Sequence, residues 1–156
     1  MTDKTTSAQK PTLFVDRSGW RKGPWDDELD RYEWKDEATG LDCLIVRDVT
    51  LCGYVAVPPG HPMHRQSRDT PDVQVHGGLT YADACQGQVC HTPSPGEPDD
   101  VWWFGFDCGH CGDQVPDRNS LDRGTYRNVA YVKAEVARLA AQLKSGKNDN
   151  DYDNDD

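Results

Sequence analysis

The chain has 156 residues, a formal net charge of −10 and 35% hydrophobic residues, which indicates one globular domain with polar ends. The negative charge makes nucleic acid an unlikely partner, because binding to phosphates needs basic groups. No apolar run reaches the ~18 residues of a membrane span, and the polar residues 1–10 lack the apolar segment of a secretory signal. The sequence therefore predicts a cytoplasmic protein without membrane contact.

Both ends of the chain are predicted to be disordered tails. Residues 1–12 are rich in Thr, Ser, Lys and Gln, and residues 146–156 are acidic. Acidic runs of this kind usually remain solvated, although they also suit a basic partner surface. The single globular domain is expected to cover residues 13–145, beginning with a short edge strand at residues 13–15.

Three strands are predicted between residues 31 and 57, arranged as an antiparallel meander. Residues 31–35 alternate between large aromatic and charged side chains, and residues 41–47 and 51–57 are rich in branched apolar side chains. The run Pro58-Pro59-Gly60 ends the third strand.

Further strand signals follow the meander. Residues 73–76 alternate, and after a break at Gly77-Gly78 the signal continues over residues 79–81. Residues 84–100 contain three prolines and are predicted to form a long loop. Residues 101–106 are apolar on both faces, as is typical of a central strand.

The clearest helix signal covers residues 126–143, with Thr125 as the predicted N-cap. Its apolar side chains recur at three- and four-residue spacing: Val129, Val132, Val136, Leu139 and Leu143. The predicted fold class is therefore α+β, with about five mostly antiparallel strands and one long C-terminal helix packed on a face.

A polar turn after residue 106 carries closely spaced metal-ligand side chains. Its Cys-x-x-Cys-Gly pattern is typical of a zinc knuckle, and the candidate ligands for zinc or another divalent metal are Cys108, Cys111, His110 and Asp107. A second pair of ligands would come from Cys85 and Cys90, with His91 as a substitute. In a chain without a secretory signal, six cysteines favour reduced thiols or a metal site over disulfides. The alternative is that these thiols are buried as small apolar side chains.

Carboxylates and imidazoles gathered at a strand end also suit general acid–base or metal-assisted catalysis. The candidate catalytic residues are His76, Asp107, His110 and Asp113. The alternative is structural: the two aspartates cap loop amides, and His110 is a buried, hydrogen-bonded histidine.

The two turns that contain these residues are expected to lie side by side and to form a ligand pocket. Two successive glycines let a ligand approach the backbone, and their amides suit an anion. The alternative is a bulge that serves packing alone. The candidate ligand-binding residues are His76, Gly77, Gly78, Thr80, Tyr81, Trp103, Asp107 and His110.

Four segments resemble a family of small uncharacterised proteins that are frequent in tailed-phage genomes and also occur in bacteria. The segments are 53–62, 75–81, 105–113 and 131–136, and they include the signatures HGGLT and DCxHxGD. The resemblance extends over about residues 19–143 and brings no known activity. It implies a phage origin and a role in the host cytoplasm during infection. In the family pattern the position of Cys111 is often alanine, which favours the four catalytic candidates over the zinc knuckle.

Two functions from different classes remain open. In the first, the protein is a phage-encoded accessory factor, for example an anti-defence protein, that binds a small polar or nucleotide-like ligand or a host protein through the two turns. In the second, the same turns bind a divalent metal and hydrolyse a phosphoester or an amide. The absence of a clear nucleophile–base pair in the sequence favours the binding protein.

Overall fold

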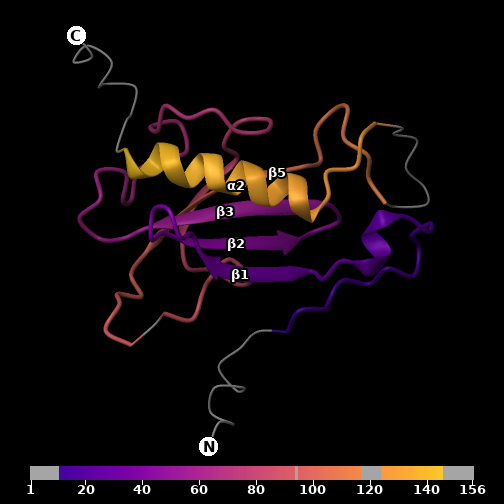
Figure 1. The fold of residues 1–156 in the computed structure, drawn as a ribbon, viewed down its shortest axis with the longest axis horizontal. Coiled ribbons are helices and arrows are strands. Elements are labelled where there is room, and N and C mark those ends of the chain that lie inside the picture. The colour runs from indigo at the N-terminus through magenta and orange to yellow at the C-terminus, as the bar shows by residue number, and fades with distance from the viewer. Residues whose placement is uncertain (1–10, 94, 117–123, 146–156) are drawn as a thin grey trace, which may run out of the picture.

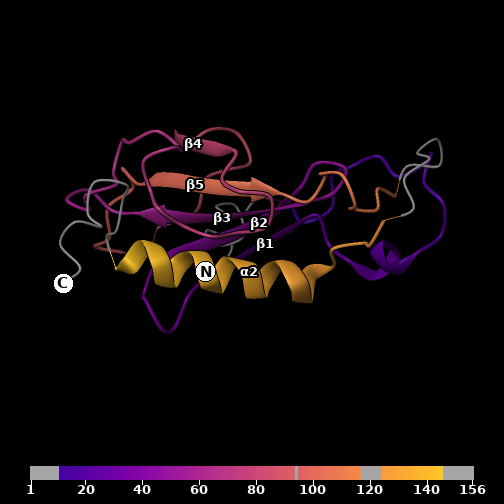
Figure 2. The same ribbon diagram turned by 90° about the horizontal axis from the view of Figure 1, so that it is seen from above.

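The computed structural model describes residues 11–93, 95–116 and 124–145. They form a five-stranded antiparallel sheet and a helix, α2, that covers one face of it (Figures 1 and 2). The predicted α+β class, with antiparallel strands and one C-terminal helix packed on a face, is confirmed. Apart from residues 11 and 12, the predicted tails at 1–12 and 146–156 lie outside the described residues.

The order of the strands in the sheet is β1-β2-β3-β5-β4. The first three strands form the predicted meander, and β5 then pairs with β3 while β4 occupies the far edge. A short 3-10 helix, η1, precedes the sheet. The bounds are η1 Pro24–Asp27, β1 Arg31–Lys35, β2 Asp42–Arg47, β3 Leu51–Val57, β4 Tyr81–Ala84 and β5 Trp102–Asp107.

Both faces of the central strands are buried, which explains their continuous apolar sequences. On the face covered by α2, Phe104 and Phe106 of β5 join the main core. On the opposite face, Trp103 packs in a second apolar cluster with side chains from β2 and β3. The prediction that residues 101–106 form a strand covered on both sides is therefore confirmed.

Helix α2 runs from Val129 to Lys144, three residues later at its start than predicted. Its N-cap is Asn128, whose side-chain oxygen accepts a hydrogen bond from the amide of Tyr131 at 2.9 Å. The prediction of Thr125 as N-cap is wrong, because Thr125 forms a β-bridge with Asp113 instead. The apolar stripe is confirmed, since Val132, Val136, Leu139 and Leu143 are fully buried against the sheet.

Two predicted strands are wrong, and in both cases side chains take the place of a neighbouring strand. At residues 13–15, the carboxylate of Asp30 accepts the amides of Phe14 and Val15, each at 2.8 Å. At residues 73–76, α2 provides the partners: Gln142 bonds both backbone groups of Gln74, and Glu135 accepts the amide of His76. A strand-like sequence therefore occurs without a β-ladder in both segments.

Across residues 11–93, 95–116 and 124–145, every helix is too short or too polar to cross a lipid bilayer.

Candidate functional site

The turn at residues 75–78 and the turn at residues 107–113 lie side by side. Gly77 has a φ of 69°, in the left-handed region, and a Cβ at this position would overlap the ring of His110. The glycine is therefore needed so that the histidine of one turn can lie against the backbone of the other. This space is filled by His110, so it is not open to a ligand.

Asp113 holds the two turns together. Its side chain is 1% exposed and accepts hydrogen bonds from His76 Nε2 at 2.8 Å, from Arg127 Nε at 2.9 Å and from the amide of His110 at 3.0 Å. Burial alone would raise the pKa of this carboxyl group, but the hydrogen bonds from His76, Arg127 and the His110 amide outweigh burial and lower it. Asp113 is therefore a structural carboxylate that stays ionised.

Both ring nitrogens of His76 are engaged. Because Nε2 lies against the Asp113 carboxylate, it donates, and Nδ1 then accepts from the hydroxyl of Tyr131 at 2.8 Å. Burial and the nearby Glu135 raise the pKa of Tyr131, so its hydroxyl keeps the proton that it donates. His76 consequently fastens the turns to α2 and has no free nitrogen with which to act as a base.

Asp107 and His110 are more accessible than this network, with side chains 38% and 34% exposed. Asp107 Oδ1 lies 3.3 Å from His110 Nε2, but the angle is poor and, within the described residues, that buried nitrogen has no hydrogen-bond partner. The carboxylate accepts instead from the amide of Gly109 at 3.0 Å and from the hydroxyl of Thr80 at 3.3 Å. Asp107 therefore links its own turn to Thr80, just before β4, while keeping part of its surface open.

Beside Asp107 lies an open groove of about 480 Å³, on the face of the sheet opposite α2. It is lined by Asp48, Val49, Thr50, Cys52, Tyr54, Thr80, Tyr81, Phe106, Asp107, Gly109 and Val115. Two of these residues are acidic, and none of the described residues in the lining is Lys, Arg or His. The groove is therefore a negatively charged surface with hydroxyl and aromatic groups around it.

Two tyrosines shape one wall of this groove. Tyr54 of β3 and Tyr81 of β4 lie on either side of Gly105 in β5, and their rings meet edge to face with centroids 5.3 Å apart. A Cβ at Gly105 would overlap the Tyr54 ring, so the bare backbone lets that ring lie across β5. Burial raises the pKa of both tyrosines, and the phenols remain neutral.

The candidate residues therefore divide among three places. Thr80, Tyr81 and Asp107 line the groove. His76, Gly77, Gly78, His110 and Asp113 form the junction of the two turns. Trp103 is fully buried in the second apolar cluster and contributes to neither.

Several residues of the groove and of the junction of the two turns were not among the candidates named from the sequence. Arg127 precedes the N-cap of α2 and Tyr131 lies in its first turn, and the predicted helix over residues 126–143 was the signal that could have brought them together. Asp48 and Tyr54 come from the turn between β2 and β3 and from β3 itself, and nothing local in the sequence marks them.

The expectation that Cys85 and Cys90 remain reduced or bind metal is wrong, because they form a disulfide. Gln86 and Val89 exchange two backbone hydrogen bonds of 3.0 Å, and this tight turn brings the two Cα atoms to 4.6 Å. Local turn geometry thus outweighs the expectation based on compartment. The bonded sulfurs are unavailable as the second pair of a zinc site.

The other proposed metal ligands also do not fit a zinc knuckle. Cys108 is buried in the core whereas Cys111 is exposed, and burial together with Asp113 raises the pKa of the Cys108 thiol. In the part of the chain that the structure describes, no three His, Cys, Asp or Glu side chains are grouped so as to hold a metal ion.

Comparison of the chain with protein-family models, with curated proteins and with solved structures gave no match.

Proposed function

We propose that the protein is a non-enzymatic binding protein whose groove takes a small polar ligand carrying an ammonium or guanidinium group. The supporting observation is the pairing of Asp48 and Asp107 in an open groove with no basic side chain among the described lining residues. Carboxylates pair well with such cations, and guanidinium in addition donates two parallel hydrogen bonds. The Tyr81 ring offers a further surface for a cation.

The same lining argues against a nucleotide-like ligand. Each phosphate would bring negative charge toward Asp48 and Asp107 in a chain whose formal net charge is already −10. Phosphate sites normally offer arginine, lysine or a row of free backbone amides. Here the amide of Gly109 already donates to Asp107.

Hydrolysis finds less support than binding. A general base needs an available atom near the substrate. Of the candidates, Asp107 lines the groove with a partly exposed carboxylate, whereas His76 uses both ring nitrogens within the protein and Asp113 is almost completely buried. The thiols of Cys52 and Cys108 are buried, and burial raises their pKa values, so they are poor nucleophiles.

A basic side chain of another protein carries the same chemistry as a free small cation. The resemblance to phage proteins favours a host protein as the source of the basic side chain. An arginine on the surface of that host protein would then enter the groove. An accessory role during infection would follow from such binding, and no catalytic step is required.

Arginine amide is a suitable probe, because it carries an ammonium and a guanidinium group and no carboxylate. We expect it to shift the amide NMR signals of Thr80, Tyr81 and Asp107, whereas inorganic phosphate does not. Asp107→Asn and Asp48→Asn should each weaken binding up to about fivefold, the effect of losing a partly exposed ion pair. Asp69→Asn, an exposed acid outside the groove lining, is the matched control.

A short arginine-containing peptide distinguishes a host protein from a free small molecule. Tighter binding of the peptide than of arginine amide, at the same amide signals, would identify a protein partner. Shifts that map away from the groove, or equal affinity in Asp107→Asn, Asp48→Asn and Asp69→Asn, would contradict the proposed function.

A further inference from the structure

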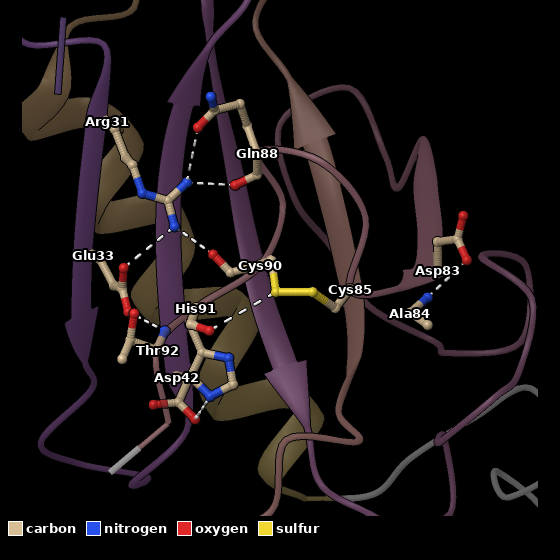
Figure 3. The surroundings of a disulfide bond; sticks show 10 residues. All are labelled: Arg31, Glu33, Asp42, Asp83, Ala84, Cys85, Gln88, Cys90, His91 and Thr92. Atoms are coloured by element: carbon tan, nitrogen blue, oxygen red, sulfur yellow. Dashed lines mark hydrogen bonds and ion pairs between the residues drawn. A yellow bond between two sulfur atoms is a disulfide. The ribbon is translucent and has the colours of Figure 1, made fainter. Parts of the chain in front are cut away.

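The face of the sheet opposite α2 is crossed by residues 85–92, here called the strap. The strap begins directly after β4 at one edge of the sheet and reaches β1 at the other edge (Figure 3). On its way Val89 is buried in the second apolar cluster, and the ring of His91 meets Trp103 edge to face at 5.5 Å. The strap therefore spans the sheet from one edge strand to the other.

The β1 end of the strap is firmly held without the disulfide. The buried guanidinium of Arg31 donates to the backbone oxygens of Gln88 and Cys90, and Glu33 accepts the amide of Thr92 at 2.9 Å. The His91 side chain is 4% exposed and lies 3.2 Å from the carboxylate of Asp42. These contacts do not depend on the oxidation state of any cysteine.

The β4 end of the strap has fewer stabilising contacts than the β1 end. β4 has four residues and lies at the edge of the sheet, and among the described residues β5 is its only strand partner. The end of β4 is joined to the part of the strap that Arg31 holds by the turn at residues 86–89, which two backbone hydrogen bonds between Gln86 and Val89 close, and the Cys85–Cys90 disulfide is a second covalent link across this turn. Cys85 is exposed and Cys90 is half-buried, so a reductant can reach the bond.

The strap and the groove share one apolar cluster. Val89 of the strap packs in the same cluster as Tyr54, and Tyr81 of β4 packs against it. Tyr54 and Tyr81 also form the aromatic wall of the groove. Any loosening of β4 relative to the strap is therefore transmitted directly to that wall.

We propose that the Cys85–Cys90 disulfide is a reversible redox clip that keeps β4 ordered and thereby regulates binding in the groove. This regulation of binding rests on the proposed function, whereas the ordering of β4 can be tested without any ligand. In the reduced protein the strap stays bound to β1, and only the turn at residues 86–89 still joins β4 to it. The groove then loses a fixed Tyr81 wall, and affinity falls.

The reductant is a dithiol. One of its thiolates attacks the sulfur of the exposed residue Cys85, the sulfur–sulfur bond breaks, and Cys90 leaves as a thiolate that takes up a proton. The second thiol of the reductant then attacks the mixed disulfide and releases Cys85 as a thiol. Two electrons and two protons pass to the protein, and the reductant becomes a disulfide.

Counting accessible thiols tests whether the Cys85–Cys90 disulfide is present and can be reduced in the folded protein. All six cysteines lie in the described residues, and of the four free thiols only Cys111 is exposed. Native alkylation followed by mass spectrometry should label Cys111 alone before dithiothreitol treatment, and Cys85, Cys90 and Cys111 after it. Labelling of Cys85 without dithiothreitol, or no additional labels after it, would overturn the clip.

Hydrogen exchange tests the ordering of β4. We expect the amides of residues 81–84 to exchange about tenfold faster in the reduced protein and in the Cys85→Ser/Cys90→Ser variant, with β2 and β3 unchanged. Cys111→Ser is the matched control and should exchange like the oxidised wild type. Equal exchange of β4 in the oxidised and reduced proteins would overturn the proposal.

Titration with arginine amide separates the two proposals. Binding that is about threefold or more weaker in the reduced protein supports regulation of the groove. Faster exchange of β4 with equal affinity overturns the regulation and leaves the proposed function intact. If neither form binds arginine amide, the proposed function and the regulation of binding both fail, while the exchange result still decides whether the clip orders β4.

Discussion

His76 Nε2 lies 2.8 Å from Asp113 Oδ2, and this hydrogen bond joins two turns that are 37 residues apart in the chain. The opposite ring nitrogen of His76 accepts from Tyr131 of α2 at 2.8 Å. One imidazole therefore connects both turns and the helix. Its arrangement resembles a catalytic dyad in residue types, but every polar atom of the ring serves the structure.

Removing the Asp113 carboxylate should destabilise the protein strongly. In Asp113→Ala, His76, Arg127 and the amide of His110 lose their acceptor. We expect the free energy of unfolding to fall by about 2–4 kcal/mol, because buried donors are left without partners. Urea unfolding measures this loss. Asp69→Asn, an exposed acid, should change stability by less than about 0.5 kcal/mol, and an equal effect of the two substitutions would contradict the role of Asp113.

The lowered pKa of Asp113 predicts a pH dependence of stability. Its carboxyl group has a pKa below the ordinary value of 3.8 in the folded protein, so the unfolded chain takes up the proton first as the pH falls. The stabilisation is present above about pH 4 and is lost as the pH falls toward the folded pKa. Asp113→Asn should therefore lose stability less steeply than the wild type below pH 4 in urea titrations. Parallel curves for the two proteins would exclude Asp113 as a contributor.

Alanine substitutions at Gly77 and Gly78 separate the free-energy cost of backbone strain from the cost of steric overlap. Both have positive φ angles, 69° and 83°, but only at Gly77 would a Cβ overlap another residue, the ring of His110. Gly78→Ala should cost about 1 kcal/mol from backbone strain, and Gly77→Ala about 1–3 kcal/mol more. Thermal unfolding checks the difference. His110→Ala in the Gly77→Ala background should recover the steric part, and no recovery would show that the overlap has another source.

Arg47 is expected to be the arginine that is least tolerant of replacement. Its side chain is 0% exposed and contacts Asp30 at 3.0 Å, Glu28 at 2.7 Å and the hydroxyl of Tyr126 at 2.9 Å. Arg47→Met should lower the free energy of unfolding by about 3–5 kcal/mol, because two carboxylates lose their buried counter-charge. Arg65→Met, at an exposed ion pair, is the control in the same urea experiment. Similar losses in both variants would contradict this interpretation.

Burial explains which elements could be predicted from the sequence. The meander, β5 and α2 each bury one or two faces, and burial leaves a repeating apolar pattern that a short stretch of sequence reveals. Residues 73–76 show the same alternation without forming a strand, because Gln142 and Glu135 of α2 take up their backbone groups. Those partners lie 68 and 59 residues away, beyond the reach of a local pattern.

The meeting of the two turns was predictable from the sequence, but the groove and the engagement of its polar atoms were not. Strand ends followed by glycine-containing turns indicated that residues 75–78 and 107–113 meet, and they do. The sequence did not indicate which polar atoms are already engaged, since that depends on Arg127 and Tyr131 near the start of α2. It also did not reveal the groove, because Asp48 and Tyr54 reach it from a different part of the sheet.

The strand order carries a consequence for synthesis of the chain. β3 is complete at residue 57, but its neighbour β5 emerges from the ribosome only with residues 102–107, after β4. Until then one edge of β3, apolar on both sides, has no strand beside it and is exposed to pairing with other chains. Arrival of β5 closes that edge and gives β4 its place, and the apolar face of the sheet is then covered when α2 follows at residues 129–144.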